Sequence, residues 1–179
     1  KFCAFSRNQD EEGAYQMSIK EILDNASHII HDNATELHIV GGLHPELGLD
    51  YYVDMIGSIH ERFPDVHIQA FTAVEIAHFA EISGMSTYET LKKLKDAGLG
   101  SLPGGGAEVF STDVRKELCP EKLSGEEWLN TMRTAHNLGM RSNATMLYGH
   151  IEKNEDRVNH LLKLRELQDE TGGFMSFIP

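Results

Sequence analysis

The chain has 179 residues, of which 40% are hydrophobic and 25% are charged, a composition typical of one soluble globular domain. Its formal net charge of −12 argues against nucleic acid or an anionic membrane surface as a partner, because both attract basic patches. No apolar run approaches the roughly 18 residues that span a bilayer, and two cysteines do not make a disulfide framework. We therefore expect a cytoplasmic protein with reduced thiols.

Three capping boxes mark helix starts. In each, a serine precedes a glutamate by three residues, at Ser18, Ser86 and Ser124. Apolar residues at helical spacing and short apolar runs define the elements between the turns. In chain order we predict a helix over 19–30, a strand over 37–40, a helix over 50–62, a strand over 66–71, a helix over 72–82, a helix ending at Gly98, a strand over 99–102, a helix ending at Gly139, a strand over 142–148, a helix capped by Asn154 and a strand over 174–178.

This alternation of helices and strands predicts an α/β fold with a parallel sheet. An open doubly wound sheet and a closed barrel both fit. Polar residues at alternate strand positions, His67 with Gln69 and Asn143 with Thr145, favour a barrel whose lumen holds a polar substrate. In either fold the functional site lies at the carboxyl ends of the strands.

Glycine-rich turns follow two of the predicted strands. Gly41-Gly42 ends the first strand, and Pro103 precedes three glycines, 104–106. Such turns let a backbone approach a ligand closely, although an ordinary tight turn is the alternative for Gly41-Gly42. The sequence holds neither a Gly-x-Gly-x-x-Gly dinucleotide motif nor a Walker lysine, which argues against both nucleotide folds.

Three carboxylates also follow strands closely. Glu75, Glu108 and Glu152 could hold ribose hydroxyls or an ammonium group by charge-assisted hydrogen bonds, or could be ordinary surface residues. The ten histidines raise a metallohydrolase as an alternative. His44, His67 and His150 could meet in a lumen, but no zinc signature supports that reading. We expect the histidines on the helices, including His136 and His160, to face away from the site.

Four segments together resemble one known superfamily. Phe2-Cys3 matches the last two positions of a Cys-x-x-x-Cys-x-aromatic-Cys motif, and Gly41-Gly42 matches a glycine motif after the second strand. Residues 143–152 and 167–174 resemble the segments of the fifth and sixth strands. The chain thus resembles the radical S-adenosylmethionine (SAM) superfamily, and within it the family of aminofutalosine synthases. Dehypoxanthine futalosine cyclases and the deazaflavin FO synthase subunits share most of these motifs and are the alternatives.

The resemblance implies the central part of a TIM-type β/α barrel, with about five to six strands. The first strand and the first two motif cysteines are missing, so we expect residues 1–179 to be a single-domain fragment truncated at both ends. Cys119 lies far along the chain from Cys3 and is not expected to replace a missing ligand. Alone, the fragment is expected to be inactive. A truncated barrel that only binds a partner is the non-catalytic alternative.

The resemblance also implies the cofactors and the reaction. A 4Fe-4S cluster would cleave SAM, and the 5′-deoxyadenosyl radical would add to 3-((1-carboxyvinyl)oxy)benzoate to give aminofutalosine for menaquinone biosynthesis. The expected partners are this small molecule and an electron donor such as flavodoxin or ferredoxin. By position, the implied site residues are Cys3 as a metal ligand, Phe2 and Phe5 beside adenine, Gly41, Gly42 and Glu108 on SAM, Thr72 on the substrate, and Glu75, Asn143, Thr145 and His150 as catalytic residues of the lumen.

Overall fold

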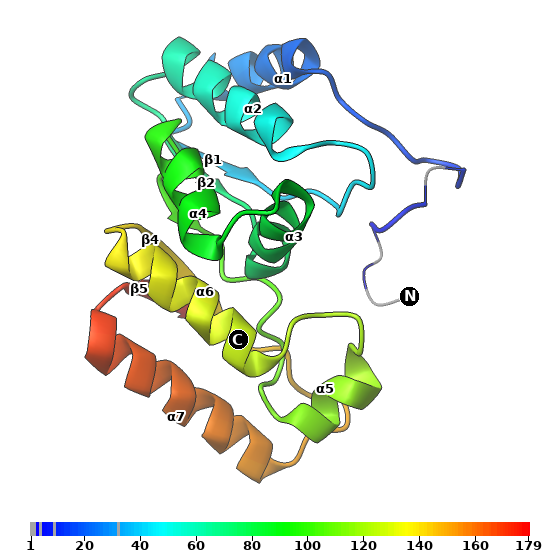
Figure 1. Ribbon diagram of the computed structural model, residues 1–179, viewed down its shortest axis with the longest axis vertical. Coiled ribbons are helices and arrows are strands. Elements are labelled where there is room, and N and C mark those ends of the chain that lie inside the picture. Colours follow the sequence, from blue (N-terminus) through cyan, green and yellow to red (C-terminus); the bar gives the residue numbers. More distant parts are fainter. Residues whose placement is uncertain (1–2, 4, 9, 32) are drawn as a thin grey trace.

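The protein forms one parallel sheet with helices on one of its faces (Figure 1). The structure is a computed structural model, and it describes Cys3 and residues 5–8, 10–31 and 33–179. The sheet has five strands in the order in which they occur along the chain. These strands are β1 (Glu36–Ile39), β2 (His67–Ala70), β3 (Ser101–Leu102), β4 (Arg141–Thr145) and β5 (Phe174–Ile178).

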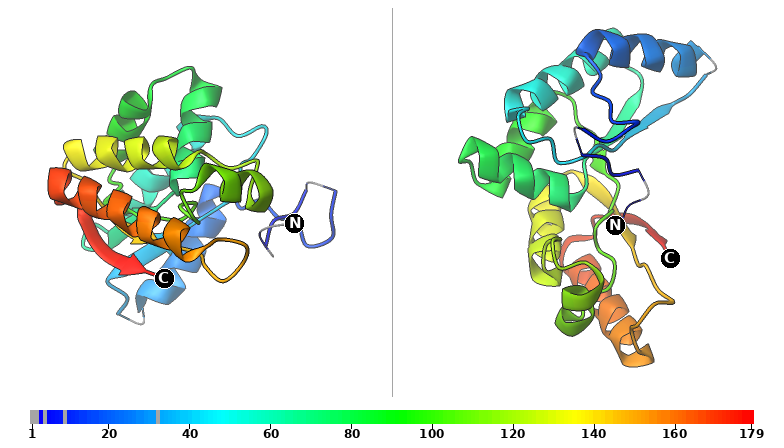
Figure 2. Two further views of the ribbon diagram at one scale, coloured as in Figure 1. Left: turned by 90° about the horizontal axis from the view of Figure 1, so that it is seen from below. Right: turned by 90° about the vertical axis from the view of Figure 1, so that its right-hand side faces the viewer.

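Helices connect successive strands, and Figure 1 looks onto the helix layer with the strands behind it. The two views of Figure 2 show this layering from below and from the side. The helices are α1 (Ile19–His31), α2 (Leu49–Arg62), α3 (Ala73–Ser83), α4 (Thr87–Asp96), α5 (Thr112–Leu118), α6 (Gly125–Asn137) and α7 (Asn154–Thr171). None of the helices in the described ranges has both the length and the apolar character needed to cross a membrane.

The strand order decides between the two architectures that fit the sequence. Each strand pairs in parallel with the strand that follows it in the chain. A doubly wound sheet reverses its strand order at a switch point and carries helices on both faces, whereas this sheet does neither. The sequential, singly wound arrangement is that of part of a TIM-type barrel.

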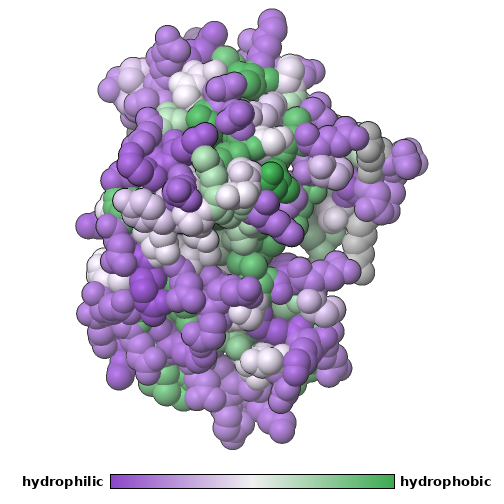
Figure 3. Space-filling view, viewed as in Figure 1, coloured by the Kyte–Doolittle hydropathy of each residue, from purple (hydrophilic) through white to green (hydrophobic). Residues whose placement is uncertain are grey.

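The hydrophobic core lies between the sheet and the helices. Ile56 and Ile59 of α2, Ile68 of β2 and Trp128 of α6 are at most 1% exposed. The outer surface of the helix layer is largely hydrophilic, with hydrophobic residues gathered around α3 (Figure 3). This distribution is that of amphipathic helices which bury one face on a sheet.

The three predicted capping boxes are confirmed. The amides of Ser18, Ser86 and Ser124 each donate to the carboxylate three residues later, at 2.7, 2.9 and 2.8 Å. The predicted cap of the last long helix was wrong, because Asn154 is the first helical residue and Lys153 precedes it as the cap. Asp156 closes this helix start by accepting the amide of Lys153 at 2.9 Å.

Two further elements differ from the prediction. α5 was not predicted, because its seven residues are too few to show a helical period. β4 ends at Thr145 instead of residue 148. The chain leaves the sheet there because the amide of Leu147 donates to the carbonyl of Glu108 at 3.0 Å, a residue of the neighbouring loop.

Candidate functional site

The loops that follow the strands all lie at one edge of the sheet, as the parallel pairing requires. The described part of the N-terminal segment lies on this same side of the molecule (Figure 1). The edge therefore gathers most of the candidate residues from separate parts of the sequence. The loops are the turn after β1 with Gly41 and Gly42, the start of α3 at Thr72, the loop over residues 103–109 after β3, and the loop over residues 146–152 after β4.

Glu75 joins the first two of these loops. It is 3% exposed, and its Oε1 accepts the amide of Gly41 at 3.0 Å. Its Oε2 accepts the amide and the hydroxyl of Thr72 at 2.8 and 2.9 Å. Burial raises the pKa of Glu75, and these hydrogen bonds act against that rise. Glu75 therefore fixes the end of β1 relative to the start of α3, and its catalytic role stays a prediction.

The two glycines after β1 are exposed. A Cβ built on Gly42 meets no atom within 4 Å, and one built on Gly41 meets only Glu75 Oε1 at 3.5 Å. Contacts within the chain therefore do not require glycine at either position. Space remains at this turn for a ligand that approaches the backbone, as the resemblance implies for SAM.

The glycine-rich loop after β3 behaves differently. A Cβ on Gly104 would lie 2.3 Å from the carbonyl oxygen of Asn143 in β4, and the residue has φ +78°. Packing against the neighbouring strand therefore explains this glycine without a ligand.

Glu108 lies in the same loop with a left-handed backbone, φ 46°. Its side chain is mostly buried, and Oε1 forms an ion pair with Nζ of Lys122 at 2.5 Å. Neither Lys122 nor its pairing with Glu108 was predicted from the sequence.

Polar side chains form a continuous strip across the face of the sheet opposite the helices. On β4, Ser142 faces α6 and its hydroxyl bonds Nε2 of His136 at 2.9 Å, so the next residue, Asn143, points to the other face. The strip, His67, Gln69, Ser101, Asn143 and Ser176, is linked by hydrogen bonds of 2.7, 3.0, 3.4 and 2.8 Å. This placement is the one that a barrel lumen requires of His67 and Asn143.

Thr145 stands at the carboxyl end of β4. Its hydroxyl donates to the carbonyl of Gly104 at 2.9 Å, and its own carbonyl bonds Nε2 of His160 at 2.9 Å. His160 is fully buried and stacks on Phe110 with ring centres 4.0 Å apart. Burial lowers the pKa of His160 to about 4, so the ring is neutral at pH 7. The sequence analysis expected His160 to face away from the site. In the structure its ring lies on the helix side of β4 and bonds the carbonyl of Thr145.

Glu152 builds the loop after β4. Its carboxylate accepts the amides of Gly149 and His150 at 2.6 and 2.9 Å, and Arg157 pairs with it at 2.7 Å. The hydrogen bond from the amide of Gly149 contributes most to lowering the pKa of Glu152 to about 2. Glu152 is thus occupied within its own loop and is a poor candidate for a ribose ligand, whereas His150 is exposed at the edge.

The cysteines differ in accessibility. Cys3 is exposed and Cys119 is buried, and burial raises the pKa of the Cys119 thiol. A buried, protonated thiol is a poor metal ligand, so the chain offers one suitable thiolate for a cluster, at Cys3. Phe5 is 90% exposed, and Phe2 lies outside the described residues. No group of three or more metal-ligating side chains occurs within the described ranges.

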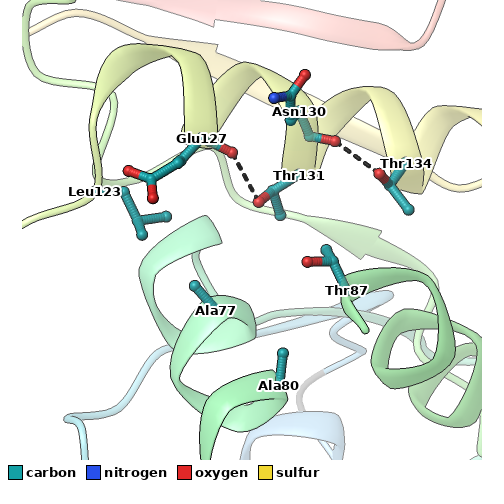
Figure 4. Close-up of a pocket in the computed structure, with 8 residues that line it drawn as sticks. All are labelled: Ala77, Ala80, Thr87, Leu123, Glu127, Asn130, Thr131 and Thr134. Atoms are coloured by element: carbon teal, nitrogen blue, oxygen red, sulfur yellow. Dashed lines mark hydrogen bonds between the residues drawn. The ribbon is translucent and has the colours of Figure 1, made fainter. Parts of the chain in front are cut away.

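A pocket of about 220 Å³ lies in the helix layer among α3, α4 and α6 (Figure 4). Two of its hydroxyls, those of Thr131 and Thr134, donate to carbonyls of their own helix at 3.0 and 2.7 Å. Because these polar groups are already satisfied and the lining includes no histidine or cysteine, the pocket offers no catalytic arrangement. The carboxyl edge remains the candidate site.

The comparison with protein families matches residues 1–164 to the Radical SAM superfamily. Among curated proteins, the chain is 49% identical over 178 residues to aminodeoxyfutalosine synthase of Thermus thermophilus. It is 42% identical over 179 residues to 5-amino-6-(D-ribitylamino)uracil–L-tyrosine 4-hydroxyphenyl transferase of Methanopyrus kandleri. These alignments cover 99% and 100% of this chain but 48% of each relative. The chain therefore spans about half the length of the curated relatives that it matches.

A solved structure supports the fold. The crystal structure of HydG, a maturase of the FeFe-hydrogenase, superposes with a TM-score of 0.72 at 20% identity. The match covers 97% of this chain and 38% of that protein.

Proposed function

We propose that this chain, which belongs to the radical SAM superfamily, forms the central part of an aminofutalosine synthase. Members of the superfamily use a 4Fe-4S cluster and SAM. The observation that carries the choice of reaction is the 49% identity to aminodeoxyfutalosine synthases of Thermus thermophilus and Streptomyces coelicolor. The substrate would be 3-((1-carboxyvinyl)oxy)benzoate, and the product would be aminofutalosine for menaquinone biosynthesis.

In this proposal Cys3 holds one iron of the cluster, and the other thiolates come from outside the 179 residues. When bound, the cluster supplies the electron that cleaves SAM. The exposed turn at Gly41 and Gly42 approaches the amino-acid end of SAM, and Glu108 faces its polar groups. Phe5 packs beside adenine, as we also expect for Phe2. An electron donor such as flavodoxin or ferredoxin delivers the electron.

The polar face of the sheet would receive the second substrate. Asn143 can donate and accept hydrogen bonds through its amide, and Thr72, Thr145 and His150 lie at or just after the carboxyl ends of strands. His150 is exposed at this edge, where its imidazole can donate or accept a hydrogen bond. Glu75 acts in this arrangement by positioning Gly41 and Thr72.

The 4-hydroxyphenyl transferase reaction is the second candidate. Archaeal relatives with this name are 42 to 44% identical to the chain over at least 99% of its length. Their printed substrates are L-tyrosine and 5-amino-6-(D-ribitylamino)uracil, which differ from the benzoate in charge and size. A dehypoxanthine futalosine cyclase is a further alternative from the sequence motifs.

Product identification tests the proposal. The full-length enzyme, with its cluster reconstituted, is incubated with SAM and a reductant and either the benzoate or the tyrosine and uracil pair. We expect a SAM-derived adduct by mass spectrometry only with the benzoate. A product in which the 4-hydroxyphenyl group of tyrosine is joined to the uracil would contradict the proposal and establish the second candidate.

Two controls accompany this experiment. Cys3→Ala in the full-length enzyme should lose iron content and SAM cleavage, whereas Cys119→Ala should retain both. The isolated 179 residues should show no iron–sulfur absorbance after anaerobic reconstitution, because a single suitable thiolate cannot hold the cluster. A reconstituted, SAM-cleaving 179-residue chain would contradict the ligand assignment.

A further inference from the structure

In the loop after β3, six consecutive backbone carbonyls are bound by donors from other segments. From Gly104 to Val109, each of the six consecutive backbone carbonyls accepts a hydrogen bond from outside the loop. Thr145 Oγ1 and Trp128 Nε1 bind the first two, at 2.9 and 3.1 Å, and the amide of Leu147 binds Glu108 O at 3.0 Å. Arg115 binds the remaining three.

Arg115 makes these bonds as a buried cation. It is 5% exposed, and its Nη1 donates to Ala107 and Val109 at 2.6 and 3.2 Å. Its Nη2 donates to Gly106 at 3.2 Å and to Leu123. A buried charge is costly unless it is hydrogen-bonded, and the planar fork of arginine suits several carbonyls at once. Both Nη atoms are bonded in this way, while the buried Nε has no partner among the described residues. The guanidinium therefore holds the backbone of this loop in place through three of its carbonyls.

The loop conformation that Arg115 stabilises is an unfavourable one at Glu108. A non-glycine residue at φ 46° costs roughly 1 kcal/mol and persists only where its surroundings hold it. Arg115 binds the carbonyls on both sides of Glu108, those of Ala107 and Val109. The direction of the Glu108 side chain, and its 2.5 Å pairing with Lys122, thus depend on Arg115.

We propose that Arg115 is a positioning residue for SAM binding: it holds the loop over residues 104–109 so that Glu108 is presented to SAM before SAM arrives. This inference rests on the proposed contact between Glu108 and SAM. Arg115 does not touch the ligand in this assignment. Its removal should therefore weaken SAM binding through the loop, while the site of the second substrate on the polar strip is left intact.

The test uses Arg115→Lys in the full-length, cluster-loaded enzyme. Lysine keeps the charge but cannot bridge the separate carbonyls. We expect the Kd and KM for SAM to rise about tenfold, which corresponds to about 1.4 kcal/mol, while the KM for the second substrate changes less than about twofold. We also expect faster amide hydrogen exchange over residues 103–110 and unchanged exchange over α7.

Two matched variants separate positioning from general destabilisation. Arg133→Lys changes an arginine of α6 that pairs with Glu170 on the surface, and it should leave every parameter unchanged. Met132→Ala removes a fully buried side chain of the same helix, and it should lower the melting temperature while leaving SAM affinity unchanged. If Arg115→Lys lowers stability but leaves SAM affinity unchanged, or if Met132→Ala weakens SAM equally, the positioning role is refuted.

The outcomes also distinguish this inference from the proposed function. A wild-type enzyme that binds no SAM would refute the function itself. If the wild type and Arg115→Lys bind SAM with equal affinity, only the role of Arg115 is refuted. Should Arg115→Lys not fold, Trp128→Phe removes the single donor to the Gly105 carbonyl. We then expect a smaller rise of SAM Kd, about threefold, and an unchanged Kd would overturn the inference.

Discussion

The turn after β1 and the loop after β3 lie at the same edge of the sheet but are held in different ways. In the loop, six successive carbonyls are bound by side chains and by a distant amide, and Ala107 and Val109 are fully buried. In the turn, Val40 and Leu43 are about half exposed, at 59% and 49%, and Glu75 reaches the amide of Gly41. One side of the site is thus preformed, while the other leaves open space beside the backbone.

The difference teaches that the two glycine motifs have different physical causes. Gly104 is required by the close approach of β4, whereas Gly42 has free space around it. A glycine-rich turn after a strand is therefore not by itself a sign of ligand contact. The surroundings of each glycine decide which cause applies.

The largest effect expected of a single substitution tests this distinction directly. Gly104→Ala should destabilise the protein by about 3 kcal/mol, because it combines a left-handed backbone with a Cβ placed against Asn143 O. Gly42→Ala should change the free energy of unfolding by less than about 0.5 kcal/mol. Urea denaturation of both variants measures the difference, and equal losses would show that the two turns are held alike.

The next effect is a pH dependence that arises from two buried histidines, His160 beside the end of β4 and His136 beside its start. Burial lowers the pKa values of His160 and His136 to about 4, below the value of about 6.5 expected in the unfolded chain. The unfolded state therefore binds more protons between these values, so the stability is complete above pH 6.5 and is lost as the pH falls toward 4. Between pH 7.5 and 5 we expect a loss of about 2 kcal/mol per histidine.

Chemical denaturation at the two pH values measures this loss. His160→Gln should lose less stability on acidification than the wild type does, because it removes one of the two buried imidazoles. An equal pH dependence would show that His160 is not the group responsible. His28, which is exposed on α1, provides the matched control, since His28→Gln should keep the wild-type dependence.

The smallest effect concerns the open side. Glu75→Gln should destabilise the protein by about 1 to 2 kcal/mol, because the buried side chain would then place an amide donor against the amide donor of Gly41 or Thr72. Glu89→Gln alters a similar capping box at Ser86 on the exposed surface and should cost less. Hydrogen exchange at Gly41 should accelerate in Glu75→Gln alone, and unchanged protection there would contradict the role of Glu75 in holding the turn.

Much of the fold could be predicted because its signals are local. The serine and glutamate of a capping box are three residues apart, so Ser18, Ser86 and Ser124 could be identified from the sequence alone. Alternating helices and strands predicted the parallel sheet, and Asn143 lies on the face opposite the helices, as the alternation of polar residues predicted. Strand ends were predicted less accurately: β2, β3 and β4 are each two residues shorter than expected, because short strands carry little pattern.

The supports of the site could not be predicted, because they depend on contacts between remote segments. Nothing in the sequence around Arg115 indicates that it binds the carbonyls of residues 106, 107 and 109. His160 lies on a helix whose sequence gives no sign of a bond to Thr145. Glu75 and Glu152 were selected correctly as carboxylates near strand ends, but their hydrogen bonds within the chain become visible only when the loops are placed.

The polar strip across the open face of the sheet has a consequence for how new specificities arise. Its side chains are bonded to one another across four strands, so exchanging one amide or hydroxyl would change the hydrogen-bonding groups that its neighbours present. Amide groups can also be turned to present either a donor or an acceptor. A scaffold built this way can be adapted to differently shaped substrates by a few substitutions, while the machinery for its shared cofactor stays untouched.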